Sequence, residues 1–170
     1  MALVIKNLCK SFAVPVLKGV NLQIDAGSIH GLVGENGAGK STLINILMGL
    51  LSRSSGELTL NEAVYNPIQV SDAFAAGFSL AAQELSLIDH LSIAENILLK
   101  VLPNHCGVLN QAQIAQQAQH WADLIGLNSV SVMAKVAGLS LAQKQLVELA
   151  KALATATKLL ILDEPTAALT

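Results

Sequence analysis

Apolar and polar positions in the first part of the chain follow the two-residue period of β-strands. Residues 3–9 form a mostly apolar run, and Val20, Leu22 and Ile24 alternate with polar residues. Alternation of this kind leaves one face of a strand in solvent, which favours antiparallel pairing. A further apolar stretch at residues 28–33 predicts a buried strand. The N-terminal region is therefore expected to hold a small antiparallel sheet ahead of an α/β core.

Helical spacing takes over after residue 40. Apolar residues at positions 43, 44, 46 and 47 predict one buried helical face. Beyond this helix, residues 57–60 and 78–81 predict short strands, and residues 70–76 predict a short helix that stops at Gly77. This succession of strands and helices is typical of the α/β class.

Between residues 85 and 151 the spacing is helical and strand patterns are not found. Ile93, Ile97 and Val101 predict one buried face. The Ala- and Gln-rich run at residues 110–117 predicts a solvated helix surface. The buried face of that second helix is expected to comprise Ile114, Ala118, Trp121, Leu124 and Ile125.

A third helix is expected to begin at a capping box formed by Ser140 and Gln143. The buried stripe of this helix is predicted to comprise Leu146, Leu149, Ala150 and Leu153. The chain then returns to four consecutive apolar residues, 159–162, which are typical of a strand buried in a parallel sheet.

Composition narrows the class of partner. The chain has 170 residues, a net charge of −2 and no basic run, so nucleic acid is not expected as a partner. No apolar run approaches the roughly 20 residues of a spanning helix, and no signal-peptide pattern opens the chain, which favours a cytoplasmic location. Cys9 and Cys106 lack metal-ligand spacing and are expected to be reduced structural thiols.

The most specific motif lies between the strand predicted at residues 28–33 and the following helix. Residues 34–42 fit the pattern G-x-x-x-x-G-K-[ST], whose glycines let backbone N–H groups close around phosphate oxygens. Lys40 would reach the β and γ phosphates, and Ser41 would hold Mg²⁺. The predicted phosphate-binding residues are Gly34, Glu35, Asn36, Gly37, Ala38, Gly39, Lys40, Ser41 and Thr42.

Three further residues lie next to predicted strand ends, where ligands bind in open α/β sheets. Asp163 and Glu164 follow the apolar strand at 159–162. Asp163 would coordinate Mg²⁺, usually through water, and Glu164 would take the proton of an attacking water. Gln83 follows the strand at 78–81 and is either a contact to the metal or the attacking water, or a solvated loop residue.

Phe12 is one of few aromatic residues and falls just before the second predicted strand. Two interpretations stay open for its ring. One is packing in the core, and the other is stacking on a nucleobase.

Taken together, these motifs resemble those of the ATP-binding subunits of ABC transporters. Residues 34–42 resemble the Walker A loop, residues 139–143 the family signature, and residues 159–164 the Walker B strand. The resemblance implies an α/β P-loop NTPase core of the ABC type with an N-terminal antiparallel β region and an inserted α-helical subdomain. Residues 1–84 and 158–170 would form the nucleotide-binding core, and residues 85–157 the helical subdomain that carries the signature.

The resemblance also implies roles for individual residues, with ATP and Mg²⁺ as cofactors. Gln83 matches the Q-loop glutamine, and Phe12 falls where the family places its adenine-stacking aromatic. Catalytic roles are implied for Glu164, Gln83 and Lys40, and metal contacts for Ser41, Gln83 and Asp163. Ser140 and Gln143 of the signature would approach the ATP of a neighbouring subunit.

Within the family, residues 146–153 are most similar to importers of ribose and other simple sugars. The implied partners are transmembrane permease subunits, a second ATP-binding domain and, indirectly, a periplasmic or extracellular substrate-binding protein. The implied location is the inner face of the cell membrane, as a peripheral cytoplasmic protein. Ala142 departs from the usual signature glycine and adds a methyl group at the expected phosphate contact.

A second departure concerns the last residues. The family pattern continues beyond Thr166 into a full D-loop and a switch histidine, and none of the four histidines matches that position. The resemblance is therefore to a cassette truncated after Walker B, which is expected to bind Mg-ATP weakly and to hydrolyse it at a negligible rate. The alternatives are a remnant that binds nucleotide without useful turnover and a soluble ABC protein acting on ribosomes or DNA. A small GTPase is disfavoured because residues 157–160 fail the N/T-K-x-D pattern at the last position.

Overall fold

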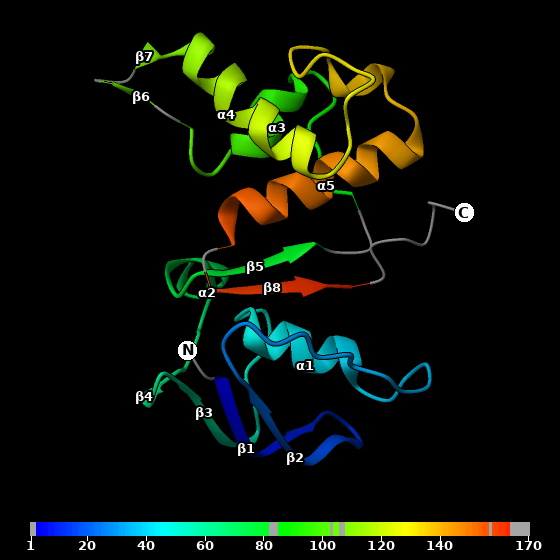
Figure 1. The fold of residues 1–170 in the computed structure, drawn as a ribbon. Coiled ribbons are helices and arrows are strands. Elements are labelled where there is room, and N and C mark those ends of the chain that lie inside the picture. Colours follow the sequence, from blue (N-terminus) through cyan, green and yellow to red (C-terminus); the bar gives the residue numbers. More distant parts are fainter. Residues whose placement is uncertain (1–2, 82–84, 103, 106–107, 157, 164–170) are drawn as a thin grey trace. The chain divides into compact units, whose positions relative to one another are not determined.

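The computed structural model describes residues 3–81, 85–102, 104–105, 108–156 and 158–163. The chain divides into two compact units, Met1–Ala76 and Gly77–Thr170. Each unit is built around its own sheet, shown with its helices in Figure 1.

The first unit contains a four-stranded antiparallel sheet in the order β2-β1-β3-β4. Its strands are β1 (Leu3–Ser11), β2 (Pro15–Ile24), β3 (Ser55–Leu60) and β4 (Ala63–Val64). Leu3, Ile5 and Leu8 of β1 are fully buried, and Leu22 and Ile24 of β2 are more buried than their polar neighbours. The predicted N-terminal antiparallel region is thereby confirmed.

Helix α1 (Lys40–Leu47) follows the phosphate-loop motif and contacts β2. Its buried residues are Leu43, Ile44, Ile46 and Leu47, as the spacing predicts. The hydroxyl of Tyr65 donates to the Leu47 carbonyl at 2.7 Å and ties the end of α1 to the residue after β4. Burial, with a smaller contribution from Asp72, raises the pKa of Tyr65 to about 12. The hydroxyl therefore remains a donor at neutral pH.

The short helix α2 (Val70–Ala75) closes the first unit. The Asp72 carboxylate accepts hydrogen bonds from the backbone N–H groups of Ile68 and Gln69, at 2.9 and 3.1 Å. These bonds lower the pKa of Asp72. Helix α2 ends before Gly77, as predicted, and Gly77 has a φ of 87°.

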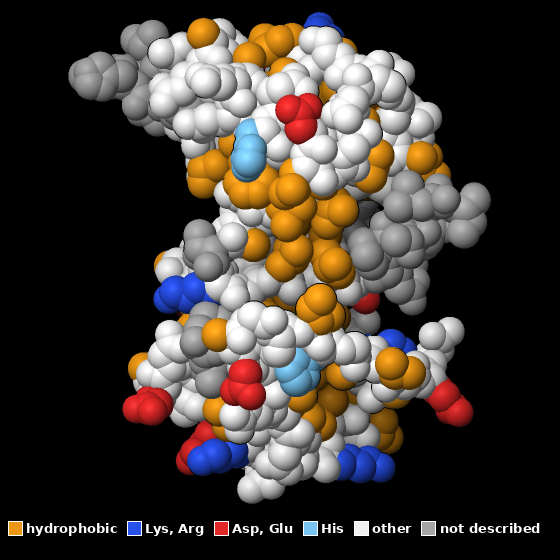
Figure 2. Space-filling model, viewed as in Figure 1, with side chains coloured by type: hydrophobic (Ala, Val, Ile, Leu, Met, Phe, Trp, Pro, Cys, Tyr) orange, Lys and Arg blue, Asp and Glu red, His pale blue; other side chains and the backbone are white. Residues whose placement is uncertain are grey.

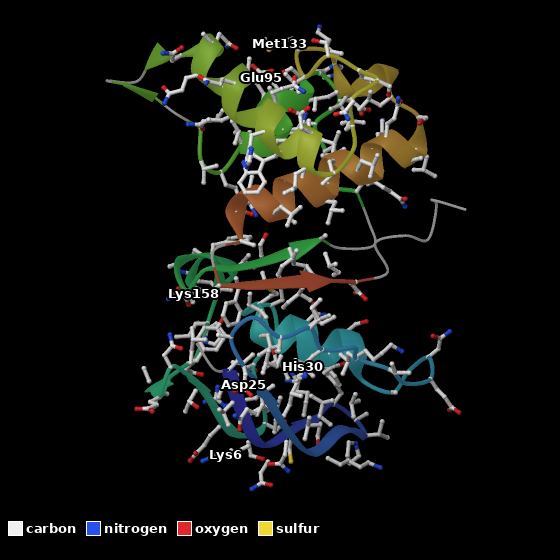
Figure 3. The ribbon with its side chains drawn as sticks, in the orientation of Figure 1. Lys6, Asp25, His30, Glu95, Met133 and Lys158 are labelled. Carbon is white, nitrogen blue, oxygen red and sulfur yellow. The ribbon has the colours of Figure 1, made fainter. Side chains whose placement is uncertain are left out.

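The prediction of a strand at residues 28–33 is wrong, because this segment has no strand structure. Ile29 and Val33 are 101% and 94% exposed, and Figure 2 shows apolar side chains at the surface. Asp25, labelled with His30 in Figure 3, turns the chain here by accepting hydrogen bonds from Ser28 at its carbonyl. A strand requires a hydrogen-bonded neighbour, and the described sheet of this unit pairs no strand with residues 28–33.

The second unit contains a two-stranded parallel sheet with a helix packed on it. Strand β5 (Phe78–Ala81) pairs in parallel with β8 (Leu159–Leu162), and both were predicted from their apolar runs. Helix α5 (Leu141–Thr155) packs on β5 and also contacts the helices α3 (Ile93–Leu98) and α4 (Gln111–Leu124), as Figure 1 shows.

The helical core forms around fully buried residues of all three helices, among them Ile93, Ile97, Ile114, Ala118, Val147 and Ala150. Several predicted positions differ. Val101 and Leu124 are exposed, because α3 ends at Leu98 and Leu124 is the last residue of α4. The predicted stripe of α5 is also wrong in part: Leu146, Leu149 and Leu153 are half-buried, because the most buried face of α5 is centred on Val147 and Ala150.

Two small elements complete the second unit. A hairpin of two-residue strands, β6 (Asn104–His105) and β7 (Val108–Leu109), lies in the region where only helices were predicted, because strands this short show no alternation. The 3₁₀-helix η1 (Val136–Gly138) precedes α5. Among the described residues, no helix is both long and apolar enough to cross a membrane.

Candidate nucleotide-binding site

The phosphate-loop motif folds back on the side chain of its lysine. Lys40 is the first residue of α1, and its Nζ donates to the carbonyls of Gly34 and Glu35 at 2.7 and 3.0 Å. The loop is further closed by a hydrogen bond from the Ala38 N–H to the Glu35 carbonyl, at 3.1 Å. The ammonium group is thereby held against the backbone of the loop.

Two glycines give this loop its shape. Gly37 and Gly39 have φ values of 84° and 96°, in the left-handed region that favours glycine. A Cβ at position 39 would lie 2.8 Å from Leu17 Cδ2 and 3.3 Å from Val16 Cγ1 of β2. The end of the loop is therefore seated directly against β2.

The start of α1 offers unused hydrogen-bond donors. The N–H groups of Lys40, Ser41 and Thr42 have no carbonyl within the helix, and Gly39 supplies no side-chain cap. Ser41 is exposed, so its hydroxyl is accessible. A helix N-terminus with open N–H groups, an adjacent ammonium and a free hydroxyl is a donor set that suits a polyphosphate with a bound Mg²⁺.

Phe12 lies in the connection between β1 and β2, four residues before the β2 residue that contacts Gly39. Its ring is 55% exposed, so the interpretation as a core residue is wrong. Lys10 places its Nζ 5.0 Å from the centre of the Phe12 ring, and the same Nζ donates to the Ser52 carbonyl at 2.6 Å.

Lys10 was missed by the sequence analysis. No pattern in the sequence marks this contact, because Phe12 lies beyond the end of β1 and the alternation of side chains along a strand does not extend to it. A cation on an aromatic ring stabilises the arrangement by about 0.5–1 kcal/mol at an exposed site, so Lys10 helps to orient the ring of Phe12.

In the second unit, Asp163 comes directly after β8 and is half-buried. Its backbone N–H donates to the carbonyl of Ala81, the last residue of β5, at 3.0 Å. Asp163 therefore lies at the carboxyl ends of two parallel strands, as predicted. Gln83 and Glu164 lie outside the described residues.

Ser140 and Gln143 form the predicted capping box of α5. The Ser140 hydroxyl accepts from the Gln143 N–H at 3.3 Å, and the Gln143 side chain accepts from the Ser140 N–H at 2.9 Å. Ser140 is exposed, and Leu141 beside it is also exposed. The signature residues therefore lie at an accessible helix N-terminus.

The predicted site residues divide between the two units. Phe12 and residues 34–42 belong to the first unit, whereas Asp163, Ser140 and Gln143 belong to the second. In the described parts of the chain, no group of three or more His, Cys, Asp or Glu residues forms a metal site.

Comparison with known families identifies the family of the chain. The family model described as ABC transporter matches residues 17–167, and the chain therefore belongs to the ABC transporter family.

Curated relatives come from sugar import systems. The chain is 40% identical over its full length to the ribose import ATP-binding protein RbsA of Chromobacterium violaceum, and it covers 34% of that protein. It is 41% identical, over 92% of its length, to the arabinose import ATP-binding protein AraG of Rhizobium meliloti, of which it covers 30%. The chain thus spans about a third of the length of these relatives.

Solved structures confirm the fold class. The dimeric structure of MJ0796, a bacterial ABC transporter cassette, matches with a TM-score of 0.83 and 27% identity, over 99% of this chain and 76% of the other. The ADP conformation of MJ1267, an ATP-binding cassette of an ABC transporter, matches with the same TM-score of 0.83 at 24% identity, over 100% and 71% of the two chains. The second likeness is one of fold alone.

Proposed function

We propose that the chain is the ATP-binding module of an ABC importer for a simple sugar, and that it couples ATP binding and hydrolysis to transport. The observation that carries this proposal is the loop of residues 34–39, closed around Lys40 Nζ at the start of α1 and seated on β2. The names of the curated relatives support the assignment to sugar import.

The groups of the first unit described above have separate roles in nucleotide binding. The N–H groups at the start of α1 and the Lys40 ammonium bind phosphate oxygens. Because Lys40 is already held by two carbonyl oxygens of the loop, it remains positioned when a phosphate arrives. The exposed ring of Phe12 stacks on the adenine, and Ser41 contributes its hydroxyl to Mg²⁺.

Hydrolysis is assigned to residues near the strand ends of the second unit. Asp163 would help to hold a bound Mg²⁺, and Gln83 would contact either the metal or the attacking water. Glu164 accepts the proton of that water. Mg²⁺, when bound, offsets negative charge on the transferred phosphoryl group.

The proposal includes the assembly in which such a module works. The ATP bound to a second ATP-binding domain contacts the start of α5 at Ser140 and Gln143. Transmembrane permease subunits receive the conformational change at the inner face of the membrane. A substrate-binding protein outside the membrane takes part indirectly. Residues 1–84 and 158–170 are assigned to the nucleotide core, and residues 85–157 to the helical subdomain.

A calorimetric titration of the purified chain with Mg-ATP tests the proposal. Replacing Lys40 with Ala removes a charged donor, which is worth about 1.5–3 kcal/mol, so Kd should rise roughly 10- to 200-fold. Lys18→Ala is the matched control, because Lys18 is an exposed lysine on β2, and its Kd should match that of the wild type. Equal affinities of the Lys40→Ala variant and the wild type would show that residues 34–42 are not the phosphate site.

A further inference from the structure

Helix α5 carries two charged residues that are buried in the second unit. Glu148 is 6% exposed and Lys151 is 8% exposed. The Lys151 Nζ lies 3.3 Å from Glu148 Oε1. An ion pair removed from water contributes little net stability, because desolvation offsets the attraction between the charges. The pair therefore calls for an explanation other than stability.

The pair reaches across to the segment that follows β5. The Ser86 hydroxyl donates to Glu148 Oε1 at 2.7 Å, and the Ser86 N–H donates to Glu148 Oε2 at 3.3 Å. Lys151 Nζ donates to the Ser86 hydroxyl oxygen at 2.6 Å and to the Ser86 carbonyl at 3.0 Å. We call Ser86, Glu148 and Lys151 the α5 clamp. Both backbone polar groups and the side chain of Ser86 are used in it.

The same segment is held at two further points. Asn96 of α3 is fully buried, and its amide group accepts from the Ile88 N–H and donates to the Ile88 carbonyl, at 2.8 and 3.0 Å. Lys144 of α5 forms an ion pair with Asp89 at 2.8 Å. Residues 86–89 are thus fixed to α3 and to α5 at once.

The α5 clamp is connected along the chain to two parts of the candidate site, the strand ends near Asp163 and the start of α5 at Ser140. In one direction, Ser86 comes five residues after Ala81, whose carbonyl binds the backbone of Asp163. In the other, Glu148 lies eight residues along a continuous helix from Ser140, or roughly 12 Å at 1.5 Å per residue. Near its C-terminal end, α5 is also tied to β5 by the 2.8 Å hydrogen bond between Thr155 and Ser79.

We propose that Ser86, Glu148 and Lys151 are positioning residues that hold the Ser140 end of α5 at a fixed place relative to the carboxyl ends of β5 and β8. Charged groups suit this task because their hydrogen bonds are directional, whereas apolar packing permits sliding. The consequence for catalysis rests on the proposed function. The clamp fixes the positions of Ser140 and Gln143 relative to the strand ends before they contact the ATP of a second domain.

The test is a distance measured between two spin labels on the full chain, in the absence of nucleotide. Labels are placed at Leu141→Cys, at the exposed start of α5, and at Leu162→Cys, an exposed position at the carboxyl end of β8. The background carries Cys9→Ser and Cys106→Ser. The unmodified clamp should give one narrow distance distribution.

The main variant is the pair Glu148→Leu and Lys151→Met, which removes both charges together and leaves no buried charge unpaired. The distribution should broaden at least twofold, while Lys151→Arg, which keeps the charge and the donors, should leave it narrow. Ser86→Ala is a second variant, at a half-buried position, that leaves the Glu148–Lys151 ion pair in place, and it should broaden the distribution to a smaller extent.

Asp123→Asn serves as the control, because it removes an exposed charge on α4, where the carboxylate accepts a hydrogen bond from Gln119, and it should leave the width unchanged. An unchanged width in both the Glu148→Leu/Lys151→Met and the Ser86→Ala variants would overturn the proposal. Since no nucleotide is added, failure of ATP binding in the calorimetric titration would refute the proposed function alone and would leave this result standing.

Discussion

Replacing Gly39 with Ala should destabilise the first unit by two additive effects. The residue has a φ of 96°, and a non-glycine residue in this region costs roughly 1–2 kcal/mol. The added Cβ would also lie 2.8 Å from Leu17 Cδ2, and Leu17 is buried, so its side chain has little room to move. Such overpacking typically costs about 1–3 kcal/mol. The free energy of unfolding should therefore fall by roughly 2–5 kcal/mol.

Gly37→Ala is the matched control for this substitution. Gly37 has a similar φ of 84°, but a Cβ there would meet nothing within 4 Å. Only the conformational cost of roughly 1–2 kcal/mol should remain. Urea unfolding followed by circular dichroism measures both variants, and the difference between them isolates the contact with β2. Equal losses in the two variants would refute the argument that the loop is seated on β2.

Two further outcomes are expected. Phe12→Ala should weaken binding of Mg-ATP more than binding of inorganic triphosphate, because the exposed ring acts on the base alone; equal losses for both ligands in a calorimetric titration would contradict stacking. Hydrogen bonds from the backbone and side chain of Ser92 lower the pKa of Glu95 from its ordinary value of 4.5, so its charged form stabilises α3 above that pH and the stabilisation is lost as pH falls through the lowered value. Glu95→Gln keeps the capping box, and its Tm should be lower than that of the wild type at pH 7 and equal to it at low pH. A difference in Tm that does not depend on pH would contradict this linkage.

Local patterns account for the parts of the fold that the sequence predicted. The motif at residues 34–42 and the apolar positions of α1 depend on neighbours within a few residues, and so does the capping box of Ser140 and Gln143. Strand β8 was recognisable because it is a continuous apolar run between Lys158 and Asp163, and β5 because it is a short, mostly apolar segment after Gly77.

Contacts between distant segments account for what the sequence did not predict. Residues 28–33 have the apolar character of a strand, but pairing depends on a partner that the pattern does not name. Periodicity also assigns charged residues to the solvent, so the burial of Glu148 and Lys151 against Ser86 was missed. The contact between Lys10 and Phe12 was missed for a local reason, because it forms where β1 ends and strand periodicity no longer applies.

Hydrogen exchange in the presence and absence of Mg-ATP tests the central assignment most directly, because it locates the ligand on the chain. The account predicts that bound Mg-ATP slows exchange of the backbone N–H groups between residues 36 and 42, where the loop meets α1. Lys40→Ala should abolish most of this protection at the same ligand concentration. Protection confined to other segments, with residues 36–42 unchanged, would contradict the claim that this loop holds the phosphates.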